Sequence, residues 1–423
     1  MTEAERRVRT LVDDLFRREA GRMVATLTRL FSPARIDLAE DVVQEALVRA
    51  LRVWSIEGVP ANPRAWIVEV ARNRALDLVR RDRAFAGKED EVRRWASRRA
   101  PDAAAGAGEA DEPRDDEMRM IFVCCHDAIP REARVALTLK TLGGFSKAEI
   151  ARAFLLSEDA VEQRLVRAKR LVRERGLRFE LPGEVDLPNR LDAVLEVLYL
   201  LFNEGYGAHR GGSLVRADLV REAIRLGSLL LETEATRPPK ARALLALFLL
   251  QGARLGARTA PDGTLVLLAE QDRSAWDASM IALGLDQLRL AAAGDELSTY
   301  HLEAGIAACH AAASSAEATD WDRILSLYDL LAALAPSPIV ALNRAVAVAM
   351  VRGAEEALRE VDAIAPQEAL ARYYLLPATR GELLRRTGDL AAAARAYADA
   401  LELAGTDPER RFLERRLAEC RGA

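Results

Sequence analysis

The sequence predicts an all-α protein, and three observations carry that prediction. Half of the 423 residues are hydrophobic, whereas only 5% are aromatic. Alanine, leucine, arginine and glutamate dominate and runs of β-branched residues are scarce, which favours helices over strands. Apolar residues recur at helical spacing along most of the chain. A chain of this length is too long for one ordinary core, so several domains are expected.

Composition and terminal sequence indicate a cytoplasmic protein that does not enter a membrane. The N-terminal stretch 1–14 is polar and lacks the apolar core of a secretory signal. The longest apolar run, 243–250, is too short to span a bilayer. The four cysteines form no spaced disulfide framework, which favours a reducing compartment. The net charge of −4 decides nothing about nucleic acid, because opposite local charges can cancel.

The first predicted unit covers residues 1–83 and contains a strong helix at 36–54. Asp37 and Glu40 match the D-x-x-E capping pattern at its start. Apolar residues then recur at i, i+3 and i+4 and predict one buried face: Val42, Val43, Ala46, Leu47, Ala50 and Leu51.

A second helix of this unit is predicted over 62–83. Asn62 is its expected N-cap and Pro63 occupies the first helical position. Trp66 shares a face with Val70 and is predicted to lie in the core. Arginines outnumber acidic residues along this helix, which gives it a basic surface: Arg64, Arg72, Arg74, Arg80, Arg81 and Arg83 against Glu69, Asp77 and Asp82.

Residues 84–117 are predicted to form a flexible acidic linker. The composition changes most sharply over 100–117, where seven acidic residues accompany one arginine among glycine, alanine and proline. Such a segment cannot bury enough apolar surface to fold by itself.

The second predicted unit, 118–178, contains a helix-turn-helix pattern. Ser146 and Glu149 form an S-x-x-E capping box for a short helix, and Ser157 caps a longer second helix. Val161, Leu165, Ala168 and Val172 lie on the buried face of that helix. The outward side chains on it are basic, acidic and amide: Glu158, Asp159, Glu162, Gln163, Arg164, Arg167, Lys169 and Arg170. The pattern fits a helix that enters a major groove, and the alternative is an ordinary solvated face.

A third segment is helical to the end of the chain and is divided here into 186–300 and 301–423. Near the C-terminus, small and aromatic residues fall where a tetratricopeptide helix pair requires them: Gly381, Gly388, Ala393, Tyr397 and Ala400. A weaker unit precedes it around Ala357 and Val361. Because such units bury their apolar faces by stacking on neighbours, the sequence predicts a helical array.

Two of these units together resemble a known family. The stretch DVVQEALVRALRVW with NPRAWIVEVARNRALDLVRR resembles region 2 of an extracytoplasmic-function (ECF) RNA polymerase sigma factor. The stretch REARVALTLKTLGGFSKAEIARAFLLSEDAVEQRLVRAKRLVRE resembles region 4 of the same family. The helical tail, with CCHDAIPREARVALTL and LYLLFNEGYGA, resembles a subgroup with a fused C-terminal tetratricopeptide-like extension.

The resemblance implies a fold and a set of site residues. It implies two small helical sigma domains followed by a tetratricopeptide-like repeat domain. Core polymerase, through its β′ clamp helices and β flap, and promoter DNA would be the partners. Polymerase contact would fall on Asp41, Gln44, Glu45, Arg49 and Arg52. Contact with the −10 element would fall on Asn62, Arg64, Arg72, Asn73, Arg80 and Arg81. Contact with the −35 element would fall on Lys147, Ser157, Glu158, Glu162, Gln163, Arg164, Arg167, Lys169 and Arg170.

Other polar clusters have plainer interpretations. Cys124, Cys125 and His126 lack a second pair of ligands, so buried small side chains are favoured over zinc. The segment 202–210 reads as the end of a helix, with a ligand or regulatory site as its alternative. No cofactor or metal is expected.

The leading hypothesis is a non-enzymatic sigma factor that binds core polymerase and directs promoter-specific initiation. The C-terminal array would regulate it, in part through a further protein partner, and cutting near residue 185 should alter activity. The alternative is a stand-alone helix-turn-helix regulator that recruits partners through its repeats and does not need Asp41 or Gln44. An enzyme housed in 186–300 is a weaker third hypothesis, because that segment lacks paired carboxylates or a nucleophile motif.

Overall fold

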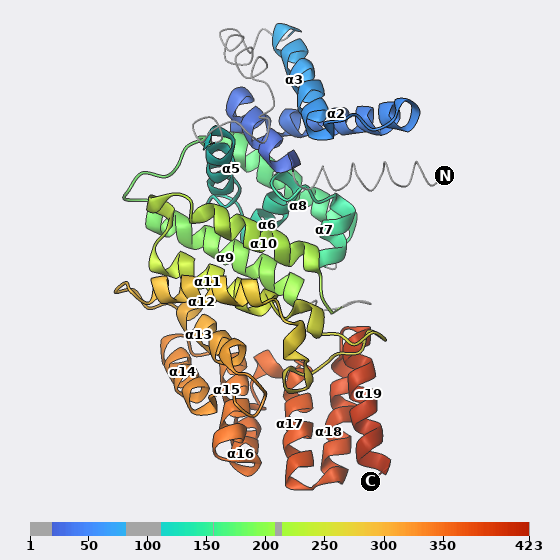
Figure 1. Cartoon of the computed structure of the whole chain (residues 1–423), viewed down its shortest axis with the longest axis vertical. Helices are drawn as coiled ribbons and strands as arrows, with labels where there is room; N and C mark the ends of the chain where they lie inside the picture. The colour runs from blue at the N-terminus through green and yellow to red at the C-terminus, as the bar shows by residue number, and fades with distance from the viewer. Residues whose placement is uncertain (1–18, 82–110, 155, 208–213, 423) are drawn as a thin grey trace. The chain divides into compact units, whose positions relative to one another are not determined.

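A computed structural model describes residues 19–81, 111–154, 156–207 and 214–422. It divides into two compact units, Met1–Leu198 and Tyr199–Ala423. Helices account for the regular structure of the described residues, apart from an isolated bridge between Thr259 and Leu265. The all-α prediction is therefore confirmed (Figure 1).

The first unit contains the helical residues 19–31 and a series of further helices. These are α2 (Ile36–Glu57), α3 (Pro63–Arg81), α5 (Asp111–Cys124), α6 (Arg131–Thr141), α7 (Lys147–Phe154), α8 (Glu158–Glu174) and the first part of α9 (Leu187–Tyr206). The predicted apolar face of α2 is buried against residues 19–31 and α3. Trp54 is 2% exposed and meets Trp66 edge-to-face, with ring centroids 5.4 Å apart. Trp66 thus packs on the core, as predicted.

The predicted cap of α2 is wrong. The helix starts at Ile36, its N-cap is Arg35, and that residue makes no side-chain capping bond. Asp37 lies in the first turn and Glu40 is buried, and both carboxylates accept from Lys169 instead. The carboxylates of a capping pattern can also pair with a cation from a distant part of the chain, and in this fold both pair with Lys169.

The predicted flexible linker also ends too late, because α5 begins at Asp111. Asp116 and Glu117 are each 1% exposed and are paired with arginines of the helix at 19–31. Arg29 Nε lies 3.0 Å from Asp116 Oδ1, and Arg22 Nε lies 3.2 Å from Glu117 Oε2. Acidic residues that composition assigns to a solvated tether are therefore buried once partners reach them. Residues 84–110 of that prediction lie outside the described residues.

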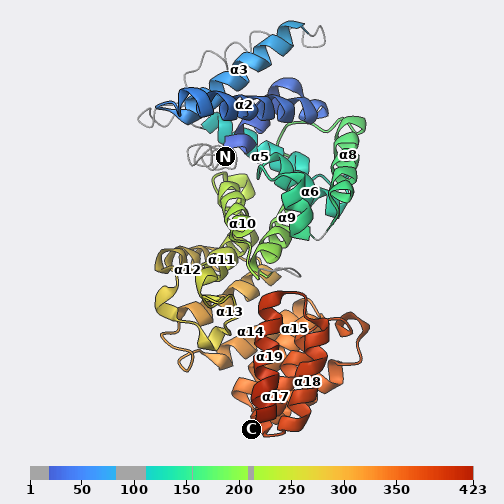
Figure 2. The ribbon, with the colours of Figure 1, turned by 90° about the vertical axis from the view of Figure 1, so that its right-hand side faces the viewer.

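Helices α6, α7 and α8 pack together, and α6 runs beside α8 (Figure 2). Cys124 and Cys125 are fully buried, as predicted, and Cys125 Sγ lies 3.7 Å from Thr138 Oγ1. The helix at 19–31 packs closely against the end of α6: a Cβ added at Gly21 would come 2.2 Å from the carbonyl oxygen of Leu142. Only glycine permits that approach.

The second unit begins at the end of α9 and continues in helices that pack against their neighbours along the chain. These are α10 (Ala217–Leu230), α11 (Pro239–Gly252), α12 (Ala278–Ala291), α13 (Thr299–Ala312), α14 (Trp321–Leu334), α15 (Pro338–Val351), α16 (Ala354–Ile364), α17 (Leu375–Thr387), α18 (Leu390–Leu403) and α19 (Asp407–Gly422). Successive pairs from α13 to α19 lie side by side (Figure 1).

The residues that suggested a repeat occupy special positions in this array. Gly388 has φ +89° directly after α17, a conformation that favours glycine at a helix end. A Cβ at Gly381 would stand 3.1 Å from the ring of Tyr397, which is 1% exposed. Ala393 and Ala400 are fully buried.

An irregular segment between α11 and α12 crosses from the first helices of this unit to the last. Leu265 and Leu267 pack against the core of α18 and α19. Arg411 Nη2 donates to the carbonyl of Gly263 at 3.0 Å, and Arg416 Nη2 lies 2.8 Å from Glu270 Oε1. We call residues 258–276 the strap.

Candidate nucleic-acid interface

The helix-turn-helix forms as the sequence predicts. Ser146 Oγ accepts from the Glu149 backbone N–H at 3.1 Å, and Glu149 Oε2 accepts from the Ser146 N–H at 2.8 Å. Ser157 Oγ accepts from the Ala160 N–H at 3.1 Å and caps α8. The predicted inward residues of α8 are all buried: Val161, Leu165, Ala168 and Val172. The capping box and the cap fix both ends of the turn and so fix the direction of α8.

The outer face of α8 carries most of the predicted −35 residues. Glu158, Gln163, Arg167 and Arg170 are exposed, and Glu162 and Arg164 are half-buried. Lys147 on α7 pairs with Glu162. Arg170 pairs only loosely with Glu174, at 3.7 Å and with both side chains more than half exposed. Exposed guanidinium and amide groups on one helix face can reach phosphates and base edges.

Lys169 does not belong to that outer face, so the prediction that it faces outward is wrong. Its side chain is 16% exposed and its Nζ lies 2.6 Å from Asp37 Oδ1 and 2.9 Å from Glu40 Oε2. Glu40 also accepts from Thr141 Oγ1 at 3.2 Å. Burial alone lowers the pKa of Lys169, but the two carboxylates outweigh it and the pKa is raised. The lysine is therefore held as a cation between α8 and α2.

The predicted polymerase-contact residues share the exposed face of α2. Asp41, Gln44, Glu45, Arg49 and Arg52 are all exposed. Glu45 is bound by Arg74 of α3, with Nε to Oε2 at 2.5 Å and Nη2 to Oε1 at 3.1 Å. The pair links the outer faces of α2 and α3, so the acidic and basic predicted sites adjoin.

The predicted −10 residues follow one another along α3. Asn62 Oδ1 accepts from the Ala65 N–H at 3.0 Å and caps the helix, as predicted. Asn73 and Arg80 are exposed and Arg72 is half-buried. The side chains of Arg64 and Arg81 lie outside the described part of the structure.

A cleft of about 360 Å³ brings two of the predicted sites face to face. Asp41 and Gln44 of α2 line one wall, and Glu162, Lys169 and Arg170 of α8 line the other. The structure thus places predicted polymerase and −35 residues on opposite walls of one cleft, bridged by Lys169. Lys140, also on its wall, was missed by sequence reasoning; burial is the main cause that lowers its pKa. No local pattern marks that lysine, because its relation to Glu40 depends on packing.

The described residues hold no group of three or more histidine, cysteine, aspartate or glutamate side chains placed to bind a metal ion. Among the helices that the structure describes, none is long and apolar enough to cross a membrane.

Family models match three parts of the chain. Sigma-70 region 2 matches residues 15–85 and Sigma-70, region 4 matches residues 119–172. A family of unknown function, DUF6596, matches residues 190–292. The two sigma matches cover the helices that carry the candidate residues.

Curated relatives extend these matches. Uncharacterized protein R00370 of Rhizobium meliloti (strain 1021) is 42% identical over 383 residues, which is 90% of each chain. The ECF RNA polymerase sigma factor SigL of Mycobacterium tuberculosis (strain ATCC 25618 / H37Rv) is 32% identical over 141 residues, 32% of this chain and 72% of the relative. No solved structure matches significantly.

Proposed function

The chain belongs to the sigma-70 family of RNA polymerase sigma factors, and from that premise we propose that it is an ECF-type sigma factor regulated by its C-terminal helices. The observation that carries this is the pair of sigma regions on one chain, in order, each with several of its candidate side chains exposed on one helix. A stand-alone regulator needs only the second region.

In the proposed function each face has one role. The exposed face of α2 binds the β′ clamp helices of core polymerase, and region 4 approaches the β flap. The start of α3 and the loop before it open and hold the −10 element, where a few kcal/mol of unstacking must be offset by contacts to the displaced base. The outer face of α8 reads the −35 element. Because the two DNA contacts share one chain, modest affinities combine. The protein performs no covalent chemistry, and its action on polymerase and promoter DNA places it in the cytoplasm.

The cleft between α2 and α8 adds a step to this scheme. In this scheme Asp41 and Gln44 of α2 contact polymerase while α8 contacts DNA. In the structure, however, these parts of α2 and α8 line opposite walls of one cleft. We propose that the Lys169 bridge opens when polymerase binds and that Lys169 then becomes available near the promoter.

The C-terminal part is proposed to consist of a helical extension domain, 186–300, and tetratricopeptide-like repeats, 301–423, which together regulate activity, in part by binding a protein partner. The neighbour-to-neighbour packing of α13–α19 supports it, as do the roles of Gly381, Gly388 and Tyr397.

Runoff transcription with purified bacterial core polymerase tests the proposal, with the DNA upstream of the protein's own gene as template. We expect transcription to depend on the protein and to fail with Asp41→Ala/Gln44→Ala. Asp399→Ala, an exposed acid of α18, is the control and should transcribe normally. DNA binding without recruitment of polymerase would reject the sigma function and favour the stand-alone regulator.

A second comparison tests the regulatory role. The first unit ends at Leu198, within α9, so a fragment cut there preserves it better than a cut near residue 185. Equal transcription by the fragment and the full chain would contradict a regulatory C-terminal domain.

A further inference from the structure

A cavity of about 410 Å³ lies within the second unit, and none of its lining residues belongs to the predicted polymerase or DNA surfaces. Trp321, Ile324 and Tyr328 of α14 form one wall, and Val346 and Met350 of α15 form another. The strap contributes further apolar surface. The volume falls in the range of small-molecule sites, which are mostly apolar with a few polar groups that orient the ligand.

One guanidinium group on these walls has a donor with only a weak acceptor. Arg386 donates through Nε to Glu382 Oε1 at 3.0 Å, but its Nη1 faces the sulfur of Met350 at 3.2 Å. A thioether is a weak acceptor, so this guanidinium retains donor capacity.

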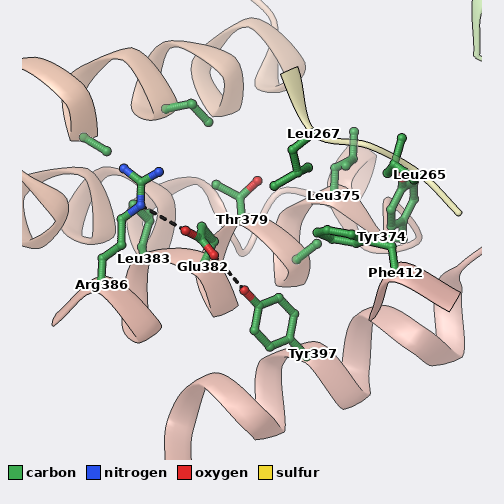
Figure 3. Close-up of a pocket in the computed structure, with 13 residues that line it drawn as sticks. Leu265, Leu267, Tyr374, Leu375, Thr379, Glu382, Leu383, Arg386, Tyr397 and Phe412 are labelled. Atoms are coloured by element: carbon green, nitrogen blue, oxygen red, sulfur yellow. Dashed lines mark hydrogen bonds and ion pairs between the residues drawn. The ribbon is translucent and has the colours of Figure 1, made fainter. Parts of the chain in front are cut away.

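Arg386 stands where two cavities adjoin. Figure 3 shows it beside Glu382 in the neighbouring cavity of about 240 Å³, which also shares Val346. That neighbour is almost wholly apolar and its Glu382 is already engaged by Arg385, Arg386 and Tyr397. Met350, the weak acceptor for Arg386 Nη1, lines the larger cavity and not its neighbour, so the spare donor of Arg386 lies at the larger cavity.

The charges around the larger cavity favour an anion. Arg273 is fixed by its Nη1, which donates to the carbonyls of His310 at 2.5 Å and Ala313 at 2.9 Å. Burial, with Arg254 and Arg273 nearby, lowers the pKa of His310 to about 4, so this imidazole is neutral at pH 7. Glu317 is the carboxylate among the lining residues, and it is exposed. Two arginines thus face one solvated acid.

We propose that this cavity binds a small molecule with an apolar, aromatic body and one anionic group. The body lies between the aromatic wall of α14 and the aliphatic wall of α15. The anionic group accepts from Arg386. Because Leu268, Ala269 and Arg273 of the strap also line the cavity, the occupied site ties the strap to α14, α15 and α17. This binding site is separate from the proposed transcription function, and the binding test below does not require that function.

The test uses the full chain and two fluorescent probes with the same ring system. 1-Anilinonaphthalene-8-sulfonate carries an anionic group, and N-phenyl-1-naphthylamine lacks it. We expect the sulfonate to bind at one site per chain, with a Kd at least about tenfold lower than that of the neutral probe. A tenfold difference in Kd is the size expected for one added hydrogen bond between charged groups.

Blocking variants locate the site. Asn343 is exposed on α15 and lines the larger cavity but not the neighbouring one, so Asn343→Trp should lower sulfonate affinity at least about tenfold. Leu330→Trp places the same side chain on an exposed position of α14 outside both cavities and should bind as wild type. Met350→Trp is the second blocking variant if the first loses helical content by circular dichroism.

A charge variant tests the anionic contact. Arg386→Gln should weaken the sulfonate about tenfold and leave the neutral probe unchanged. Arg380→Gln, on the same helix and paired with Asp362, is the control. Wild-type sulfonate binding by a folded blocking variant would overturn the site. Equal effects of Arg386→Gln on both probes, or no effect on either, would overturn the anionic class.

Discussion

Replacing Lys169 with Met should loosen the contact between α2 and α8. Methionine keeps the apolar stem and removes the ammonium group that binds Asp37 and Glu40. The Asp37 side chain is 61% exposed, so its share is about 0.5 kcal/mol. Glu40 is 9% exposed and would keep the Thr141 hydroxyl as its hydrogen-bond donor, with Lys140 as the remaining nearby cation. Breaking a fully buried pair costs about 3–5 kcal/mol, and partial exposure of the lysine reduces this to about 2–3 kcal/mol.

The expected total is about 3 kcal/mol, which raises the population of the open state about 100-fold. Hydrogen exchange measured by mass spectrometry on peptides from α2 and α8 reports that opening directly. Arg170→Met removes a cation from an exposed pair on the same helix. It should change the opening free energy measured by exchange by less than about 0.5 kcal/mol. Glu40→Gln in the Lys169→Met background should recover about 1–2 kcal/mol, because it removes the unpaired charge.

An opening free energy of Lys169→Met within about 0.5 kcal/mol of the wild-type value would refute the claim that the Lys169 bridge holds α2 against α8. Gly21→Ala offers a second route to the same opening, since its Cβ would meet the Leu142 carbonyl at 2.2 Å. If opening limits polymerase binding, both variants should bind core polymerase faster than the wild type.

Three further outcomes are expected. Burial raises the pKa of Glu303 to about 7 from 4.5, so the folded state holds the proton more tightly than the unfolded state. The free energy of unfolding should therefore fall by about 3 kcal/mol as pH rises from 4.5 to 7 and then level off. Glu303→Gln should abolish that slope in thermal melts. Gly388→Ala forces alanine to φ +89° and should cost about 1 kcal/mol in urea unfolding, whereas an unchanged midpoint would argue against the left-handed helix end. Ser146→Ala removes the capping box with Glu149 and should cost about 1 kcal/mol, seen as faster exchange in α7; equal exchange would mean that the box is not formed in solution.

Most local features of the fold could be predicted from the sequence. The ends of α3, α7 and α8 follow from Asn62, Ser146 and Ser157, because a cap involves residues three positions apart. The buried face of α8 follows from helical periodicity. The exposed candidate residues of α2 are simply those left after its apolar face is assigned. Each of these depends on neighbours within one or two helical turns.

Only the tertiary structure decided which distant charges meet. Helical periodicity assigns Lys169 to the outward face of its helix, yet it bridges to Asp37, 132 positions away. Composition assigns Asp116 and Glu117 to a flexible linker, yet they bind arginines 87 and 95 positions away. A local pattern specifies which way a side chain points from its helix. Whether it meets water, a carboxylate or a cavity depends on how the helices pack, and that is set by the apolar faces of many segments together.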